Sequence, residues 1–169
     1  MSSWKRLRSF IAIAALASAC VTLGSGCSSP KAIKSTADFK LGERVGVGSL
    51  TYNVIETSWA SQLGSIPIAR LPERNFLLVH LSVTNGGGQS VSIPFLTVEN
   101  AAGDHFQESE NGQGVDSWLG MLREVKPAET EQGWILFDVP TNSYRLQLVD
   151  GGESSVEHSA YVALPLHLD

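Results

Sequence analysis

The stretch NFLLVHLSVTN, residues 75–85, decides the fold of this chain. Its residues alternate between two faces, since the apolar side chains and the polar ones fall on opposite sides of an extended backbone. The apolar set is Leu77, Val79, Leu81 and Val83, and the opposite set is His80, Ser82 and Thr84. A period of two residues is typical of a strand with one face on a core and one face in water. Three glycines at 86–88 then turn the chain.

Further strands are predicted on both sides of this stretch. They lie near 45–47, 50–59, 91–99, 104–107, 131–140, 143–150 and 159–168, where β-branched and aromatic residues alternate with polar ones between turn residues. The core residues predicted in the last three are Ile135, Phe137, Val139, Leu146, Leu148, Val162, Leu164 and Leu166. About seven or eight short strands with almost no helical periodicity predict an all-β sandwich or barrel.

One segment, residues 108–124, carries no strand pattern. Asp116 or Ser117 is placed to cap a short helix. Trp118, Met121 and Leu122 would then lie along one side of that helix. We expect this apolar stripe to close one end of the sandwich, and the alternative is a patch that binds a partner. Trp134 alternates with core residues, so its indole is expected to pack across strands or to contact a partner. The candidate partner contacts are therefore Trp118, Met121, Leu122 and Trp134.

The amino terminus has the pattern of a secretory signal. Residues 4–9 carry three positive charges, and residues 10–24 are apolar or small. The apolar run is too short and too rich in alanine for a spanning helix, which needs about 20 apolar residues. The sequence therefore predicts an exported protein.

The end of this run resembles a bacterial lipobox, in which small residues precede a cysteine. Here the residues are LGSGC, with Cys27 four positions after Leu23 where three is commoner. The resemblance implies that diacylglycerol is attached to the Cys27 sulfur and that a peptidase cuts before it. Two or three acyl chains anchor a protein firmly. The alternatives are lipidation at Cys20 and an ordinary cysteine at position 27.

The predicted organisation is a lipoprotein signal at 1–26, a lipidated amino terminus and flexible tether at 27–40, and one sandwich domain at 41–169. For the residues after the cysteine, the alternative is a short first strand. Removal of the signal leaves nine basic residues against 17 acidic ones, a net charge of −8. Such an acidic domain argues against binding to nucleic acid or to an anionic membrane surface. With Cys27 lipidated no disulfide forms, so the core alone must hold the domain.

Several phrases occur in an order that resembles a known family. They are VGVGSLTYNV (45–54), NFLLVHLSVTNGG (75–87), VSIPFLTVENAAGDHF (91–106), KPAETEQGWILFDVP (126–140) and YRLQLVD (144–150). This set resembles a family of bacterial lipoprotein domains of unknown function, similar in fold to the mycobacterial immunoprotective extracellular protein. The resemblance implies an immunoglobulin-like antiparallel β-sandwich with at most one short helix. It implies no activity, no ligand and no catalytic residue.

Motifs for catalysis are absent from the sequence. There is no G-x-S-x-G nucleophile turn, and the histidines at 80, 105, 158 and 167 are scattered. No Cys/His spacing fits zinc. Carboxylates at Asp104, Glu108, Glu110 and Asp116 fall within one segment, which raises calcium as an alternative to a solvated acidic loop. We expect no enzyme and no cofactor.

The sequence therefore predicts a lipid-anchored cell-envelope protein that serves as a non-enzymatic interaction module. It would contact the membrane through its lipid and would bind an unknown envelope protein or wall polymer. The binding surface is expected at residues 60–75 or 108–124. The alternatives are a small-ligand or Ca²⁺-binding envelope protein that uses the acidic 104–116 loop and, least favoured, a hydrolase.

Overall fold

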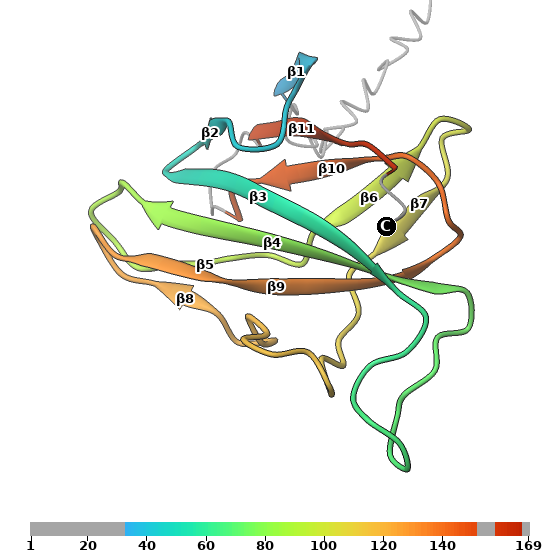
Figure 1. The fold of residues 1–169 in the computed structure, drawn as a ribbon. Helices are drawn as coiled ribbons and strands as arrows, with labels where there is room; N and C mark the ends of the chain where they lie inside the picture. The colour runs from blue at the N-terminus through green and yellow to red at the C-terminus, as the bar shows by residue number, and fades with distance from the viewer. Residues whose placement is uncertain (1–32, 152–157, 167–169) are drawn as a thin grey trace, which may run out of the picture.

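A computed structural model describes residues 33–151 and 158–166 of the chain (Figure 1). Over these residues the backbone forms eleven strands and no helix. The strands are β1 (Ile33–Phe39), β2 (Arg44–Val47), β3 (Leu50–Ala60), β4 (Asn75–Asn85), β5 (Val91–Ser92), β6 (Thr97–Asn100), β7 (His105–Gln107), β8 (Glu124–Val125), β9 (Thr130–Val139), β10 (Tyr144–Val149) and β11 (His158–Leu164). The all-β class predicted from the alternation is confirmed, with more and shorter strands than expected.

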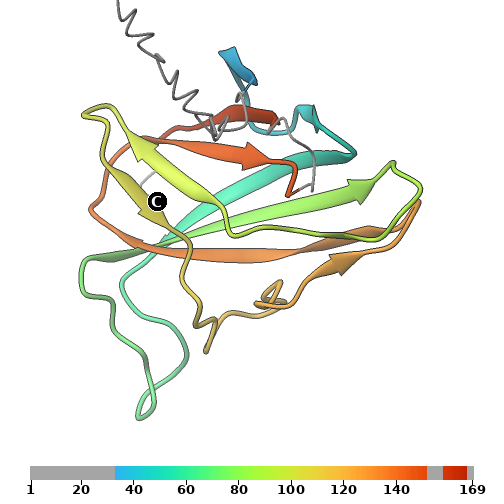
Figure 2. The same cartoon turned by 180° about the vertical axis from the view of Figure 1, so that it is seen from behind.

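Two sheets form the layers of a sandwich, as seen from both sides in Figures 1 and 2. A five-stranded sheet has the order β1-β11-β10-β6-β7, and a four-stranded sheet has the order β2-β3-β4-β9. The short strands β5 and β8 pair with each other in a third, two-stranded sheet. In the four-stranded sheet, the long strand β4 pairs along its full length with β3 on one side and β9 on the other.

The space between the two sheets holds the main core. The apolar face of β4 and the residues at 135, 137 and 139 of β9 meet side chains from β10 and β11 there. Nearly all the core residues predicted above are at most 2% exposed. The prediction for Leu166 was wrong, because its side chain is 38% exposed. Strand β11 ends at Leu164, and Pro165 has no N–H with which to continue the ladder.

The tether predicted at 27–40 is wrong for its second half. Residues 33–39 form β1, the alternative considered above, and they pair with β11 in parallel. This pair is an exception to the antiparallel pairing expected throughout. Backbone hydrogen bonding at the sheet edge orders a segment whose small polar residues carry no strand pattern of their own. The predicted signal peptide, Cys20, Cys27 and His167 lie outside the described residues.

The short helix expected around 116–122 is wrong as well. The segment instead lies along the free edge of β9, where Trp134 N–H donates to Ser117 O (3.0 Å) and Leu119 N–H donates to Trp134 O (3.0 Å). Ser117 and Gly120 have left-handed φ values of 52° and 81°, which a right-handed helix excludes. A Cβ on Gly133 would clash with the Ser117 carbonyl oxygen, so glycine permits this close approach.

The Asn-Gly-Gly motif after β4 acquires a structural explanation. Asn85 is fully buried, and its amide group donates to Gln89 O (2.7 Å) and Val125 O (2.8 Å). Its side-chain oxygen accepts from Gly87 N–H (2.8 Å). A buried amide is stable only when its hydrogen bonds are made. Asn85 therefore fixes the turn after β4 and joins it to β8.

Candidate interaction surface

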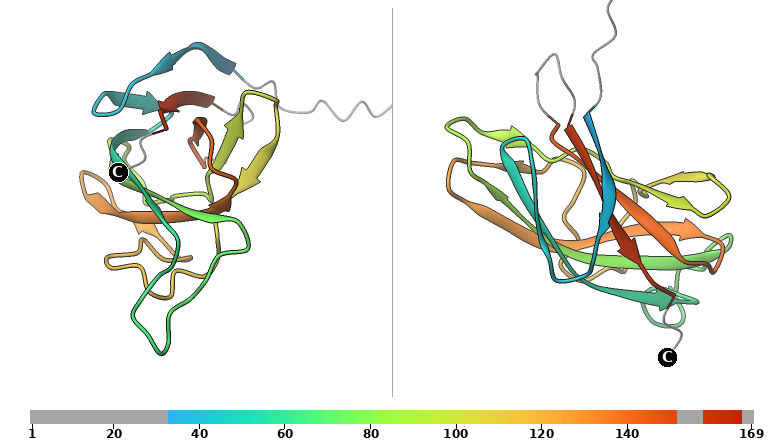
Figure 3. Two further views of the ribbon diagram at one scale, coloured as in Figure 1. Left: turned by 45° about the vertical axis from the view of Figure 1, so that its right-hand side comes forward. Right: turned by 90° about the horizontal axis from the view of Figure 1, so that it is seen from above.

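The outer face of the four-stranded sheet is covered at one end by a second, smaller apolar cluster. Leu63, Phe76 and Leu136 are its buried members, and Ala60, Leu78 and Val115 pack against them. Two connections supply the cover: the 61–74 loop between β3 and β4, and the 108–123 segment between β7 and β8. Both lie on the same side of the sheet in Figure 1 and in the left view of Figure 3.

Arg70 joins these two connections. Its guanidinium donates to Asn111 O (2.5 Å) and to Ser109 Oγ (3.4 Å), and it lies 5.0 Å from the centre of the Phe76 ring. Gly114 also approaches Leu63 closely, since a Cβ at that glycine would lie 3.1 Å from the Leu63 side chain. The two regions predicted as separate alternatives thus form one continuous surface, here called the joined loop surface.

The 61–74 loop is a hairpin that projects from the sandwich (Figure 1). Leu63 and Arg70 exchange two backbone hydrogen bonds of 2.9 and 2.8 Å, and Ile68 N–H donates to Ser65 O (3.0 Å). The Asp138 carboxylate holds the base of the loop by accepting from the backbone N–H groups of residues 73 and 74 (2.7 and 2.9 Å). The hairpin is therefore ordered by its own hydrogen bonds and by those to Asp138 of β9.

Large aliphatic side chains are exposed on this hairpin, two beyond the Leu63–Arg70 bridge and one directly after it. Ile66 is 82% exposed, Ile68 80% and Leu71 71%. Isolated exposed apolar side chains are ordinary, but a cluster of them on one ordered projection is typical of an interaction site. The composition of the loop is the corresponding signal in the sequence, because residues 61–69 contain no charge.

A buried ion pair closes the base of the 108–123 segment. Arg123 donates to both carboxylate oxygens of Glu108 (2.8 and 2.7 Å) and to the carbonyl oxygens of Ile93 (3.3 Å) and Pro94 (2.7 Å). The Glu108 carboxylate also accepts from Leu96 N–H (3.2 Å). Burial raises the pKa of Glu108, and the bonds from Arg123 lower it by less. The pair fixes the two ends of the segment to each other.

This pair overturns the predicted calcium set. Glu108 is 4% exposed and committed to Arg123, while Asp104 lies in the β6–β7 turn and accepts from the Asn100 side-chain amide (2.9 Å). Glu110 and Asp116 are exposed. In residues 33–151 and 158–166, no three acidic, histidine or cysteine side chains are grouped so as to hold a metal ion. The four carboxylates are close in sequence but do not meet in space, because β7 and the ion pair direct their side chains apart.

The four predicted contact residues divide into two kinds. Trp134 is half-buried and stacks on His80 across strands, with ring centres 4.7 Å apart, so it packs within the sheet face. Trp118 is half-buried against Gly112, where a Cβ would clash with the indole ring. Met121 and Leu122 are 49% and 100% exposed. These last two are the most exposed of the four, and partner contact by any of the four stays a prediction.

The histidines are dispersed in the fold. His80 lies between Glu56 (3.1 Å) and Gln132 (3.1 Å) on the four-stranded sheet, and His105 lies on β7 in the other sheet. His158 bonds to Asp150 (2.9 Å), which is the one histidine–carboxylate pair with a largely buried acid in the part of the chain that the structure describes. None of these contacts includes a serine hydroxyl.

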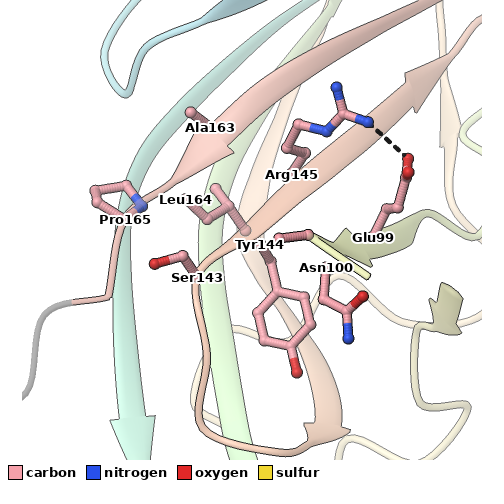
Figure 4. A pocket seen from close by; sticks show the side chains of 9 residues that line it. Glu99, Asn100, Ser143, Tyr144, Arg145, Ala163, Leu164 and Pro165 are labelled. Carbon is pink, nitrogen blue, oxygen red and sulfur yellow. Dashed lines mark ion pairs between the residues drawn. The ribbon is translucent and has the colours of Figure 1, made fainter. Parts of the chain in front are cut away.

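A groove of about 440 Å³ lies at the ends of β6, β10 and β11 (Figure 4). Glu99, Asn100, Ser143 and Arg145 supply its polar lining. Arg145 is already engaged, because it pairs with Glu99 (3.1 Å) and Asp38 (3.4 Å) and lies 4.7 Å from the Tyr161 ring centre. Nothing in the sequence indicates this groove, since three strands distant in the chain create it.

The fold has counterparts among solved structures, although no curated protein matches the chain. No helix within the described ranges is long and apolar enough to cross a membrane. Solved structures with similar folds include the yjhA protein of Bacillus subtilis, at 13% identity and a TM-score of 0.55 over 73% of this chain and 98% of that one.

Two further structures with this fold are a candidate lipoprotein and a secreted protein. The candidate lipoprotein, ycdA of Bacillus subtilis, has 9% identity and a TM-score of 0.54 over 72% of this chain and 38% of that one. The secreted protein MPT63 of Mycobacterium tuberculosis has 18% identity and a TM-score of 0.51 over 73% and 98%. These likenesses confirm the predicted sandwich fold and the predicted resemblance. A family model matches residues 39–157, and the chain therefore belongs to the DUF4352 family, a domain of unknown function.

Proposed function

We propose that this protein is an exported, lipid-anchored, non-enzymatic module of the bacterial envelope that binds a partner through the joined loop surface. The observation that carries the proposal is the contact made by Arg70, which assembles two connections into one ordered surface with exposed apolar side chains. Surface loops on a rigid sandwich commonly serve recognition.

Export and anchoring are supported by the sequence before the domain. A basic segment, an apolar run and a cysteine preceded by small residues occur in the order of a lipoprotein signal. Only five residues, 28–32, separate the modified cysteine from the start of β1. A candidate lipoprotein and a secreted protein among the similar structures agree with this location.

The anchor is tested by labelling cells with a fatty-acid analogue and recovering the full chain. We expect label on the protein and its loss in Cys27→Ser, with retention in the matched variant Cys20→Ser. Label that survives Cys27→Ser and disappears in Cys20→Ser would move the anchor to the earlier cysteine. An unsubstituted chain that takes up no label would refute lipidation.

The interaction is tested by chemical crosslinking of the lipidated protein in intact cells, followed by mass spectrometry of the linked peptides. We expect one enriched partner whose crosslinks map to residues 61–74 or 108–123. Removal of whole loops is unsuitable as a control, because Arg70, Glu108 and Arg123 hold the fold. Crosslinks to a partner confined to the five-stranded sheet would contradict the proposed surface.

The groove beside Arg145 favours a second candidate, a small-ligand binding protein. Its volume of about 440 Å³ lies in the range of small-molecule sites. A ligand that binds only the folded chain raises its melting temperature. A metabolite screen by thermal shift checks this, with Arg145→Met as the matched variant that should lose the shift.

A further inference from the structure

We propose that the apolar end of the 61–74 loop enters an apolar cleft of a partner protein, on the side of the domain that faces away from the lipid anchor. This inference rests on the proposed function and names the part of the joined loop surface that makes contact. Its residues are Ile66 and Ile68 at the outer end and Leu71 directly after the Leu63–Arg70 bridge, here together called the apolar tip.

The exposed side chains of the apolar tip are not needed to attach the loop to the domain. Leu63 in the same loop is 7% exposed and belongs to the second cluster. Its burial already packs the loop against the sheet. The two isoleucines extend beyond that cluster into solvent. Water contact at these side chains is unfavourable for the isolated domain, and burial in a complex would relieve it.

The apolar tip is also ordered before binding. The Leu63–Arg70 bonds, the Ile68-to-Ser65 bond and the two bonds to Asp138 fix the backbone around it. Arg70 further ties the hairpin to the 108–123 segment. A preordered element loses little conformational entropy on association, which favours binding through few side chains.

The position of the anchor decides between a membrane and a protein as the occupant. Strand β1 lies in the five-stranded sheet, and the 61–74 loop covers the outer face of the four-stranded sheet, so the two are on opposite sides of the sandwich (Figures 1 and 3). The six peptide units from Cys27 to Ile33 reach at most about 20 Å. The anchored bilayer therefore lies on the β1 side, and the apolar tip projects away from it.

A second copy of this chain would have to offer the groove at β6, β10 and β11, whose lining includes Ala163, Leu164 and Pro165 beside the Glu99–Arg145 ion pair. That occupant is an outcome of the test below. Two convex tips placed against each other bury far less than the about 800 Å² per partner of a stable interface. A concave apolar site on another protein is the surface that complements three projecting aliphatic side chains.

The test places a photo-crosslinking amino acid, p-benzoylphenylalanine, at position 68 of the full lipidated chain in its own cells. Matched probes stand at Gln113 on the 108–123 segment and at Ala102 in the β6–β7 turn, both exposed. We expect position 68 to give one protein adduct that Ala102 does not give. The pair Ile66→Ser and Leu71→Ser should lower the yield about tenfold or more, and Gln62→Ala should not.

Each other outcome overturns the inference in a distinct way. An adduct with lipid identifies a membrane as the occupant, and an adduct of twice the chain's mass identifies a second copy. A protein adduct at Gln113 but none at position 68 would show that the apolar tip does not contact the partner, while the proposed function would still hold. Loss of adducts at both positions, with the protein present and lipidated, refutes both.

Discussion

Both faces of β4 carry large apolar side chains, but the opposite sheet buries those on the inner face and two loops bury those on the outer face. The inner face, with Leu77, Val79 and Leu81, meets the opposite sheet along most of the strand. The outer face is buried only at one end, where Phe76 lies under the 61–74 loop and the 108–123 segment. Beyond that end the outer face continues as His80 and polar residues.

The difference shows which interactions stabilise the main core between the sheets, here called the inner layer, and the second cluster under the loops, here called the outer layer. Sheet pairing and apolar contact suffice for the inner layer, because every strand contributes alternating side chains to it. The outer layer depends on individual polar contacts, above all those of Arg70 and Arg123. The bases of the two connections are therefore structural, and only their exposed parts are available for binding.

The largest effect is expected at the buried ion pair at the base of the 108–123 segment. Arg123→Met leaves the buried Glu108 carboxylate without its partner and should lower the free energy of unfolding by about 3–5 kcal/mol. Urea denaturation measures this. The matched double variant Glu108→Gln with Arg123→Met removes both charges and keeps an acceptor for Leu96 N–H, so it should recover part of the loss. Equal losses in the single and double variants would show that the unpaired Glu108 carboxylate is not the source of the loss, which would then lie in the bonds from Arg123 to the Ile93 and Pro94 carbonyls.

A pair of identical substitutions compares the two layers directly. Leu81→Ala in the main core should lower the free energy of unfolding by about 3–4 kcal/mol, and Leu136→Ala in the second cluster by about 2–3 kcal/mol. Both side chains are fully buried, but the loops over Leu136 can collapse into the cavity more readily than a sheet can. Thermal or urea unfolding gives both values. A larger loss for Leu136→Ala would mean that the outer layer is the less adaptable one.

Arg70→Met tests the junction between the two connections. The aliphatic stem still covers Phe76, while both hydrogen bonds to the 108–123 segment are lost. We expect a loss of about 1 kcal/mol in global stability. Hydrogen exchange at the backbone amides of positions 63 and 70 should become faster, with β4 amides unchanged. Unaltered exchange at those two positions would show that the hairpin is held without this contact.

The smallest effect is expected at the apolar tip. Ile68→Ser should change the free energy of unfolding by less than about 0.5 kcal/mol, because the side chain is exposed and supports nothing beneath it. The same substitution at the buried Leu63 is the matched contrast within one loop and should cost several times more. A large loss for Ile68→Ser would assign the tip a structural role.

The sequence predicted the inner layer well because its information is local. Period-two alternation identifies β4 and β9 and the faces they bury, whichever strands lie opposite. It failed for β1, whose order comes from backbone pairing with β11, and for Ser117–Leu119, which extend along β9 where a capping signal predicts a helix. In both places a distant strand edge outweighs local propensity.

By itself the sequence determined the sandwich class and its main core, predicted an export signal with a candidate lipid site, and contained two loops of unusual composition. Only the tertiary structure decided that those loops are one surface, that Glu108 belongs to Arg123 and to no metal site, and that three aliphatic side chains project from an ordered hairpin. The physical reason is the separation along the chain of the residues that interact. Alternation and signal patterns act between neighbours in the chain, whereas Arg70 and Asn111 are 41 residues apart and meet only because β4 and β9 bring their loops together.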